Sequence, residues 1–170
     1  MSKKKSTAKA NFEKTSREDA LIVGAQLEQA LTPLCNRVEI VGSIRQGKEM
    51  VGDIDIIVVP KIEPIEFLER CKDIIEYEYG GKKKIFGMFR GRPINIFVTT
   101  PESYGACQYQ MTGPAKYNIL MRRRAKLRGF RLNEYGLFNV ESGEQVAGHD
   151  EHSIFEVLEM TYVAPTERRA

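Results

Sequence analysis

An α+β fold is predicted for this chain from the way its helical and strand-like segments are distributed. The first half mixes segments of helical periodicity with β-branched segments typical of strands. The second half adds helices and then a small region of short strands. That order is typical of the α+β class. With 170 residues, the chain is long enough for one compact unit, or two small lobes, with a real hydrophobic core.

The composition is that of an ordinary soluble globular protein. Hydrophobic residues make up 42% and charged residues 29% of the chain, and the net charge is only +3. The basic residues gather in three runs, Lys3-Lys4-Lys5, Lys82-Lys83-Lys84 and Arg122-Arg123-Arg124. A single run is usually a solvated surface, but three in so small a chain favour a polyanionic partner.

The cysteines and the apolar runs exclude several classes of protein. Cys35, Cys71 and Cys107 are far apart, and neither His149 nor His152 lies near one of them, so we expect no structural zinc. Their odd number favours reduced thiols. No apolar run is long enough to span a bilayer, and the N-terminus lacks the features of a secretory signal. We therefore expect a cytoplasmic, nuclear or viral protein that is not secreted and makes no membrane contact.

The N-terminal region predicts an arm, a helix and a strand. Residues 1–12 are rich in Lys, Ser and Ala and predict a disordered basic arm. Thr15 and Glu18 have the spacing of a capping box for a first helix that ends near Pro33. The segment Arg37–Val41 then predicts a strand.

The middle of the chain predicts a buried strand, a helix and a hairpin. Gly52–Val59 is β-branched after its acidic residues, and Pro60 closes it as a strand. Pro64–Ile75 is amphipathic and begins with proline, as helices often do. Lys83–Phe89 and Ile94–Val98 flank a short turn and predict two paired strands.

The last third predicts two helices, short strands and a final helix. Pro101–Met111 and Ala115–Leu127 are the two helices, separated by a Thr-Gly-Pro turn. Gly129–Val140 suggests short strands around a turn at Glu-Tyr-Gly. Glu151–Met160 predicts the last helix, before a polar tail.

The clearest chemical signal is a pair of aspartates. Asp53 and Asp55 are two residues apart on a predicted strand, so both side chains point to the same face. A hard cation such as Mg²⁺ would relieve their repulsion. A solvent-facing pair is the alternative, but the isoleucines around it place the strand in a core. Gly42 and Ser43 end the preceding strand and could let a phosphate approach closely, with Arg45 adding positive charge.

These residues resemble a known signature. Val41-Gly42-Ser43-Ile44-Arg45 followed by Gly52-Asp53-Ile54-Asp55 is similar to the polymerase-beta-like nucleotidyltransferases, and the spacing between the two motifs matches the family X DNA polymerases. The motif alone indicates only the superfamily, which also contains tRNA-end enzymes, terminal transferases and toxins.

The second half resembles family X more specifically. Gln110 to Asn118, Arg122, Gly129 to Phe138 and Thr161 to Pro165 resemble that family's thumb, so the resemblance covers roughly residues 36 to 165. It implies a nucleotidyltransferase palm, built on a mixed or antiparallel sheet with helices, followed by a small thumb. We expect the palm with its N-terminal helix at residues 13–104 and the thumb at 105–170. Larger members carry lyase and fingers domains before the palm, so the minimal palm-and-thumb type is implied.

The resemblance also implies roles for individual residues. Gly42, Ser43 and Arg45 would hold the triphosphate. Thr112 and Gly113 would form the bend under the incoming sugar, and Asn118 would reach the minor-groove edge of the incoming nucleotide. Arg122 would contact the template strand, and Tyr135 would pack near it. Each side chain taken alone could equally be a turn, a helix-surface amide or a solvated charge.

The pattern departs from the family at Asn95. The family's third metal-binding aspartate lies in an Ile-Asp-Ile segment, and here that segment is Ile94-Asn95-Ile96. Asp53, Asp55 and Asn95 would together form a weakened centre for Mg²⁺, with Mn²⁺ as the alternative ion. Three explanations stay open: an engineered Asp→Asn change, a slow natural enzyme, or a protein that has abandoned catalysis. Gln46, and Gln110 with Met111, are smaller departures, where relatives often carry an arginine and two aromatics.

The function implied is a template-directed DNA polymerase. It would add a dNMP from a dNTP to a primer 3′-hydroxyl by a two-metal mechanism, on primer-template or gapped DNA and in short-gap repair. We expect a monomer. Two alternatives stay open: a catalytically impaired module that binds DNA gaps or ends, and a non-templated nucleotidyltransferase acting on RNA or protein.

Overall fold

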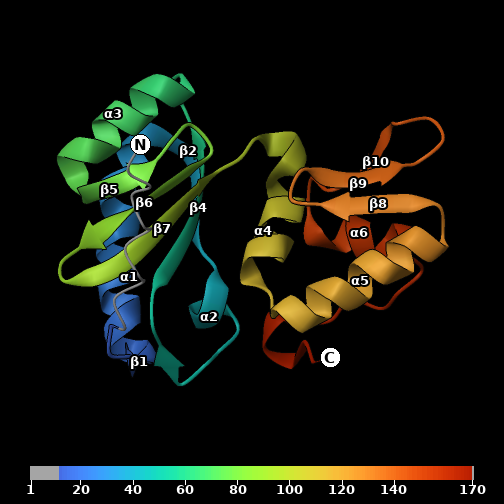
Figure 1. Ribbon diagram of the computed structural model, residues 1–170, viewed down its shortest axis with the longest axis horizontal. Helices are drawn as coiled ribbons and strands as arrows, with labels where there is room; N and C mark the ends of the chain where they lie inside the picture. The colour runs from blue at the N-terminus through green and yellow to red at the C-terminus, as the bar shows by residue number, and fades with distance from the viewer. Residues whose placement is uncertain (1–11, 170) are drawn as a thin grey trace, which may run out of the picture.

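The computed structural model describes residues 12–169, which form two lobes connected through α4 (Tyr104–Thr112) (Figure 1). The N-terminal lobe is a mixed sheet with helices, and the C-terminal lobe is a set of helices with a small sheet. The α+β prediction is therefore confirmed. The predicted basic arm at residues 1–12 lies, except for Phe12, outside the described residues.

The N-terminal lobe is built on a five-stranded sheet in the order β2-β4-β7-β6-β5. The central pair, β4 and β7, is parallel, and every other neighbouring pair is antiparallel. A mixed sheet of this kind places equivalent ends of β4 and β7 together at one edge. The strands are β2 (Cys35–Ile40), β4 (Ile54–Pro60), β5 (Glu76–Gly80), β6 (Lys84–Phe89) and β7 (Arg92–Val98).

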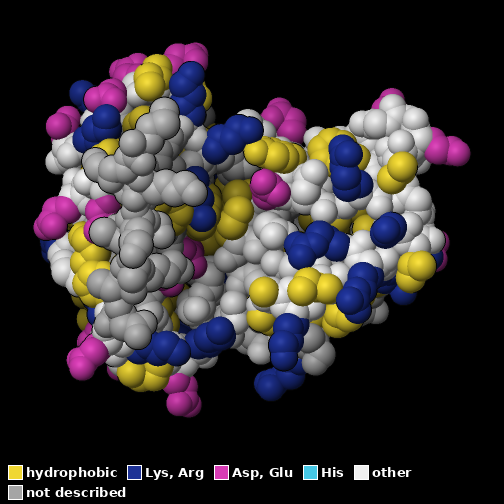
Figure 2. Space-filling view, viewed as in Figure 1, with side chains coloured by type: hydrophobic (Ala, Val, Ile, Leu, Met, Phe, Trp, Pro, Cys, Tyr) yellow, Lys and Arg dark blue, Asp and Glu magenta, His cyan; other side chains and the backbone are white. Residues whose placement is uncertain are grey.

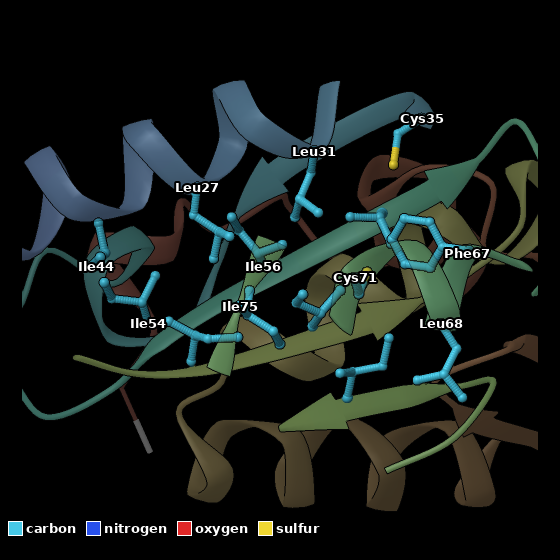
Figure 3. Packing of buried hydrophobic residues seen from close by; sticks show 14 of the residues in the cluster. Leu27, Leu31, Cys35, Ile44, Ile54, Ile56, Phe67, Leu68, Cys71 and Ile75 are labelled. Atoms are coloured by element: carbon cyan, nitrogen blue, oxygen red, sulfur yellow. The ribbon is translucent and has the colours of Figure 1, made fainter. Parts of the chain in front are cut away.

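One face of this sheet is covered by α1 (Arg17–Leu31) and α3 (Pro64–Ile74). Ile54 and Ile56 point from β4 toward Leu27 of α1, and all three side chains are fully buried (Figure 3). Burying one such side chain stabilises the fold by about 1.5–3 kcal/mol. This apolar face therefore anchors β4, the strand that carries the aspartate pair.

The opposite face of β4 and β7 meets α4. Residues alternate between the two faces of a strand, so Ile57 and Phe97 point away from α1 and pack with Tyr104. Asp55 and Asn95, each two residues earlier on its strand, share this second face. The polar residues of interest therefore lie on the side of the sheet that looks toward the C-terminal lobe.

The C-terminal lobe packs helices around a three-stranded antiparallel sheet in the order β10-β9-β8. Its core is apolar and includes Tyr109, Met121, Leu137 and Phe155. The elements are α4, α5 (Ala115–Leu127), β8 (Phe130–Asn133), β9 (Gly136–Asn139), β10 (Gln145–Ala147) and α6 (Glu151–Val157).

Several local expectations need correction. The N-cap of α1 is Ser16 rather than Thr15, because its side chain accepts a hydrogen bond from the Asp19 backbone N–H at 3.1 Å. The strands β5 and β10 were not predicted, since their sequences are short and largely exposed. Gly42–Arg45 forms a short helix, α2, whereas Gly42 and Ser43 were expected at the end of the preceding strand.

Two further helix boundaries also differ from expectation. The segment predicted at Pro101–Met111 begins with a 3-10 turn, Pro101–Ser103, before α4. The final helix ends at Val157, earlier than the predicted Met160. The remaining short elements are β1 (Thr15–Ser16), which pairs with β3 (Met50–Val51), and 3-10 turns at Thr32–Leu34 and Pro165–Glu167.

We propose that the two lobes divide between residues 104 and 105, at the start of α4. One face of α4, with Tyr104 and Cys107, contacts the N-terminal sheet, whereas Ala106 and Tyr109 on its other face belong to the core of the C-terminal lobe. The three cysteines are buried free thiols. Of the helices in residues 12–169, none has the length and apolarity needed to cross a bilayer.

Candidate active site

The parallel pairing of β4 and β7 brings the predicted metal ligands together. Asp55 and Asn95 are direct partners across the two strands, and Asp53 lies just before β4 on the same face. The Asn95 Nδ2 donates to Asp55 Oδ1 at 2.7 Å and to Asp53 Oδ2 at 3.0 Å. The three residues that the sequence singled out therefore form one cluster.

Arg92 holds the loop that carries Asp53. Its guanidinium donates to the carbonyl oxygens of Gly52 at 2.9 Å, Val51 at 3.2 Å and Glu13 at 3.1 Å. Arg92 begins β7, the strand that also carries Asn95, so it ties the Asp53 loop to its partner strand. Sequence reasoning missed this residue, because an arginine at the start of a strand carries no signal for its carbonyl partners.

Replacing Arg92 with Met is expected to lower the free energy of unfolding by about 2 kcal/mol, since charged hydrogen bonds to backbone carbonyls are lost. Arg92→Lys should fall between this variant and the wild type, because an ammonium lacks the planar fork of donors. Urea unfolding measures both. The matched control is Arg70→Met on the exposed face of α3, which should change stability very little. Equal losses at both positions would contradict the role of Arg92.

The helix α2 packs closely against the carboxylate cluster. Gly42 adopts a φ of +63°, which favours glycine, and a Cβ added there would collide with Asp55 Oδ2. Gly42 therefore permits an approach between backbone and carboxylate that no other residue would allow.

A pocket of about 320 Å³ opens beside α2. Its walls come from α2, β4, and the turn between α4 and α5. The pocket unites Asp55 with five of the residues predicted to bind nucleotide, Gly42, Ser43, Thr112, Gly113 and Asn118, and is completed by Gln46, Lys48, Gln110, Met111, Pro114 and Ala115.

The turn between α4 and α5 forms the far wall of this pocket. Gln46 Nε2 donates to the Thr112 carbonyl at 2.5 Å, which ties the turn to α2. Asn118 is only 4% exposed, and its Nδ2 donates to the Gln110 carbonyl at 2.9 Å. Its Oδ1 is buried with no hydrogen-bond partner in the structure. A buried amide oxygen that lines a pocket and has no partner can accept a hydrogen bond from a bound ligand.

Arg45 is held by a buried carboxylate rather than facing the pocket. Its guanidinium donates to Glu151 Oε1 at 2.6 Å and Oε2 at 3.0 Å, and to Thr112 Oγ1 at 2.9 Å. Glu151 also accepts from Arg168, at 2.9 and 3.2 Å, and from Tyr162. Arg45 thus fastens α2 to α6, and its contact with a triphosphate stays a prediction. Gln46, which stands where relatives often carry an arginine, lines the pocket together with Lys48.

Burial alone would raise the pKa of Glu151, but the hydrogen bonds and charges of Arg45 and Arg168 outweigh burial and hold that pKa below its ordinary value. Glu151 is therefore ionised at neutral pH. Nothing in the sequence pointed to this group, since its partners are 106 and 17 residues away.

The two residues predicted to touch DNA lie on the C-terminal lobe. Arg122 is exposed on α5, 3.4 Å from Gln110 Oε1. Tyr135 lies at the β8–β9 turn, and its hydroxyl accepts from Lys83 Nζ of the other lobe at 2.9 Å. That hydrogen bond raises the pKa of Lys83. Figure 2 shows Lys and Arg side chains over α5 and the neighbouring strand, beside the hollow between the lobes.

The donor set of this cluster fits a divalent cation only in part. Within residues 12–169, no three His, Cys, Asp or Glu side chains gather as a metal centre. Two carboxylates nevertheless lie together, both in contact with the Asn95 Nδ2, and carboxylate oxygens suit Mg²⁺. The residues therefore fit one hard cation, whereas a second would lack a third carboxylate.

The chain is similar to several known proteins. Residues 107–169 match the model of the DNA polymerase beta thumb. The chain is 26% identical to the repair DNA polymerase X of African swine fever virus (strain Badajoz 1971), over 82% of this chain and 86% of that protein. It is also 26% identical to the DNA polymerase/3′-5′ exonuclease PolX of Bacillus subtilis, over 89% of this chain but only 28% of that longer protein.

A solved structure has the same fold. The polymerase beta of Leishmania infantum, in a ternary primer-template complex, superposes with a TM-score of 0.81 at 23% identity, over 94% of this chain and 78% of the other. The palm sheet is followed by the thumb in the order that the sequence resemblance implied. Over most of its length the chain resembles the family X DNA polymerases of the palm-and-thumb type, and residues 107–169 match the thumb.

Proposed function

We propose that this chain transfers a nucleotidyl group from a dNTP to the 3′-hydroxyl of a primer, in a template-directed reaction on DNA with a short gap. The observation that carries the proposal is the pocket in which Asp55, the backbone of Gly42 and Ser43, and the unpartnered Asn118 Oδ1 meet. It offers a place for a triphosphate at one end and for a base or sugar at the other.

Different residues of the chain would serve different parts of this reaction. The primer 3′-oxygen forms a bond to the α-phosphorus, the bond to the departing pyrophosphate breaks, and the hydroxyl proton is released. Asp53 and Asp55 would hold Mg²⁺, which supplies charge stabilisation at the phosphates. Ser43, Gln46 and Lys48 line the pocket that would receive the triphosphate. Asn95 is an amide and cannot accept the proton, which must leave to a carboxylate or to water.

The thumb would position the DNA. Four basic residues of α5 are exposed, where they can meet phosphates or a groove: Lys116, Arg122, Arg123 and Lys126. Tyr135, tied to Lys83 of the palm, lies at the junction of the two lobes. The relatives support this assignment, since one is called a repair DNA polymerase and another was solved with gapped DNA.

A DNA-binding module without turnover is the second candidate. The observation that favours it is the Asn95 amide, which occupies both carboxylates through its N–H groups. Such a protein would bind gapped DNA and a nucleotide without joining the nucleotide to the primer.

The test is incorporation of each dNTP at a one-nucleotide gap under single-turnover conditions, with Mg²⁺ and with Mn²⁺. We expect slow addition of the templated nucleotide alone, and none by Asp55→Ala. Addition that ignores the template would instead indicate a non-templated nucleotidyltransferase. Gap binding without product, even when Asn95 is changed to Asp, would leave only the binding module.

Salt dependence of gap binding is a further expectation. The logarithm of the association constant should fall linearly with the logarithm of salt concentration, with a slope of about −0.9 for each phosphate contacted. Fluorescence anisotropy on a labelled gap measures this slope. Arg122→Gln and Arg123→Gln should each reduce it if these side chains contact phosphates. A slope near zero would contradict any role on DNA.

A further inference from the structure

We propose that the cluster of Asp53, Asp55 and Asn95 takes a single divalent cation, which enters with the nucleotide, and that the amide of Asn95 is what limits the site to one. This inference rests on the proposed nucleotide binding and specifies the metal content of the same site.

The first argument is the position of the Asn95 amide. An asparagine amide carries two N–H donors, and Nδ2 donates to one oxygen of each aspartate, at 2.7 and 3.0 Å. Two adjacent carboxylates would otherwise repel each other. The amide bridges them with partial positive charge and no net charge. The two carboxylates are therefore held together without a cation, and their affinity for a cation is reduced.

The second argument is charge. Two carboxylates balance one divalent cation before a nucleotide binds, whereas a second cation on the side of Asn95 would need a further carboxylate there. Asn95 pairs in register with Asp55, so an aspartate at this position would add a third carboxylate at the same place. With Asn95 that charge is absent, and within the described part of the chain no third acidic side chain joins the cluster.

A third, independent observation indicates that the cation arrives with a nucleotide. The pocket that includes Asp55 also includes Asn118, whose Oδ1 is buried and has no partner. That oxygen can accept a hydrogen bond from an N–H or O–H group of a base or sugar. Mg²⁺ and Mn²⁺ require several oxygen ligands, more than two aspartates and an amide provide. Triphosphate oxygens in the same pocket would complete the set.

The experiment measures Mn²⁺ directly. The full chain, in excess over an α,β-imido dNTP that cannot transfer its nucleotidyl group, is titrated with Mn²⁺. The free ion is followed by electron paramagnetic resonance, and retained nucleotide by equilibrium dialysis. The chain is compared with Asn95→Asp and with the control Asn36→Asp. Asn36 is exposed on β2 near the opposite end of β4, so the control adds the same charge elsewhere.

We expect one Mn²⁺ per retained nucleotide for the wild type and for Asn36→Asp, and two for Asn95→Asp. Without nucleotide, Mn²⁺ should bind Asn95→Asp at least about tenfold more tightly than the wild type, because a third carboxylate raises the demand for cation. Two Mn²⁺ per nucleotide in the wild type would overturn the inference and leave the proposed function standing. One Mn²⁺ per nucleotide in Asn95→Asp would show that the amide is not what limits the site to one cation. Failure of either protein to retain nucleotide would overturn the proposed function itself.

Discussion

Replacing Asn95 with Asp is expected to raise the single-turnover rate of templated incorporation by about a thousandfold, because a unit charge 4 Å from a cation is worth roughly 4 kcal/mol at an effective dielectric of 20. The side chains have almost the same shape, so the variant tests charge more than packing. The register with Asp55 would place the new carboxylate beside the existing pair.

The measurement is rapid-quench incorporation of the templated dNTP at a one-nucleotide gap, with saturating DNA and Mg²⁺. Asn36→Asp should leave the rate unchanged, which excludes a general effect of added charge. Asp53→Asn, introduced into Asn95→Asp, should abolish most of the gain, since both carboxylates would serve the same cation. A gain of less than about tenfold, which is 1.4 kcal/mol, would mean that the missing charge does not limit the reaction.

The same substitution separates a protein that has abandoned catalysis from the other two explanations for Asn95. A large gain means that the rest of the site is competent and that this residue alone restrains it. No gain, with nucleotide and DNA still bound, means that other parts of the site have also diverged. Gln110 and Met111, which line the pocket near the turn, are then the first residues to examine.

The palm could be predicted largely because its signals are local. The alternation of Asp53, Ile54, Asp55 and Ile56 fixes which side chains face the core, and burial of the isoleucines in the structure agrees. The resemblance located Asn95, and the parallel pairing of β4 with β7 then explains why it meets Asp55. Local signals of this kind do not indicate which strands pair, so only the resemblance to the family pointed to a meeting of these two segments.

Long-range polar contacts could not be predicted. Arg45 was assigned to the triphosphate from its place after Gly-Ser, but its bond to Glu151 spans 106 residues and depends on how the two lobes meet. Arg92 binds backbone carbonyls, which carry no residue signature. The periodicity of apolar residues indicates which face of an element is buried. It gives no information about which charged residue from elsewhere in the chain will contact a given side chain.

Breaking the cluster of Arg45, Glu151 and Arg168 is expected to have the largest effect on stability. Glu151 is 3% exposed, and the side chain of Arg168 is fully buried. Glu151→Gln should lower the free energy of unfolding by about 3–5 kcal/mol, because Arg168 would remain buried without its counter-charge. Glu159→Gln, which removes an exposed partner of Arg128, should cost less than about 1 kcal/mol.

The pH dependence gives this prediction a second signature. The folded-state pKa of Glu151 lies below its ordinary value of 4.5, so ionised Glu151 contributes its full stability above pH 4.5. That contribution is lost as the pH falls through the lower, folded-state pKa. The difference in stability between the wild type and Glu151→Gln should therefore be constant near neutrality and shrink in acid. A difference that persists unchanged into acid would show that Gln disturbs packing rather than charge.

A double replacement separates the effect of this cluster on stability from its effect on nucleotide binding. Glu151→Leu combined with Arg168→Met removes both buried charges and should recover much of the stability lost in Glu151→Gln. It should not recover nucleotide affinity, because Arg45 would still lose the carboxylate that holds α2, and α2 supplies Gly42 and Ser43 to the pocket. Urea unfolding and equilibrium dialysis of a dNTP, measured on the same variants, test these two consequences separately. Recovery of both would mean that the cluster stabilises the fold without positioning the pocket.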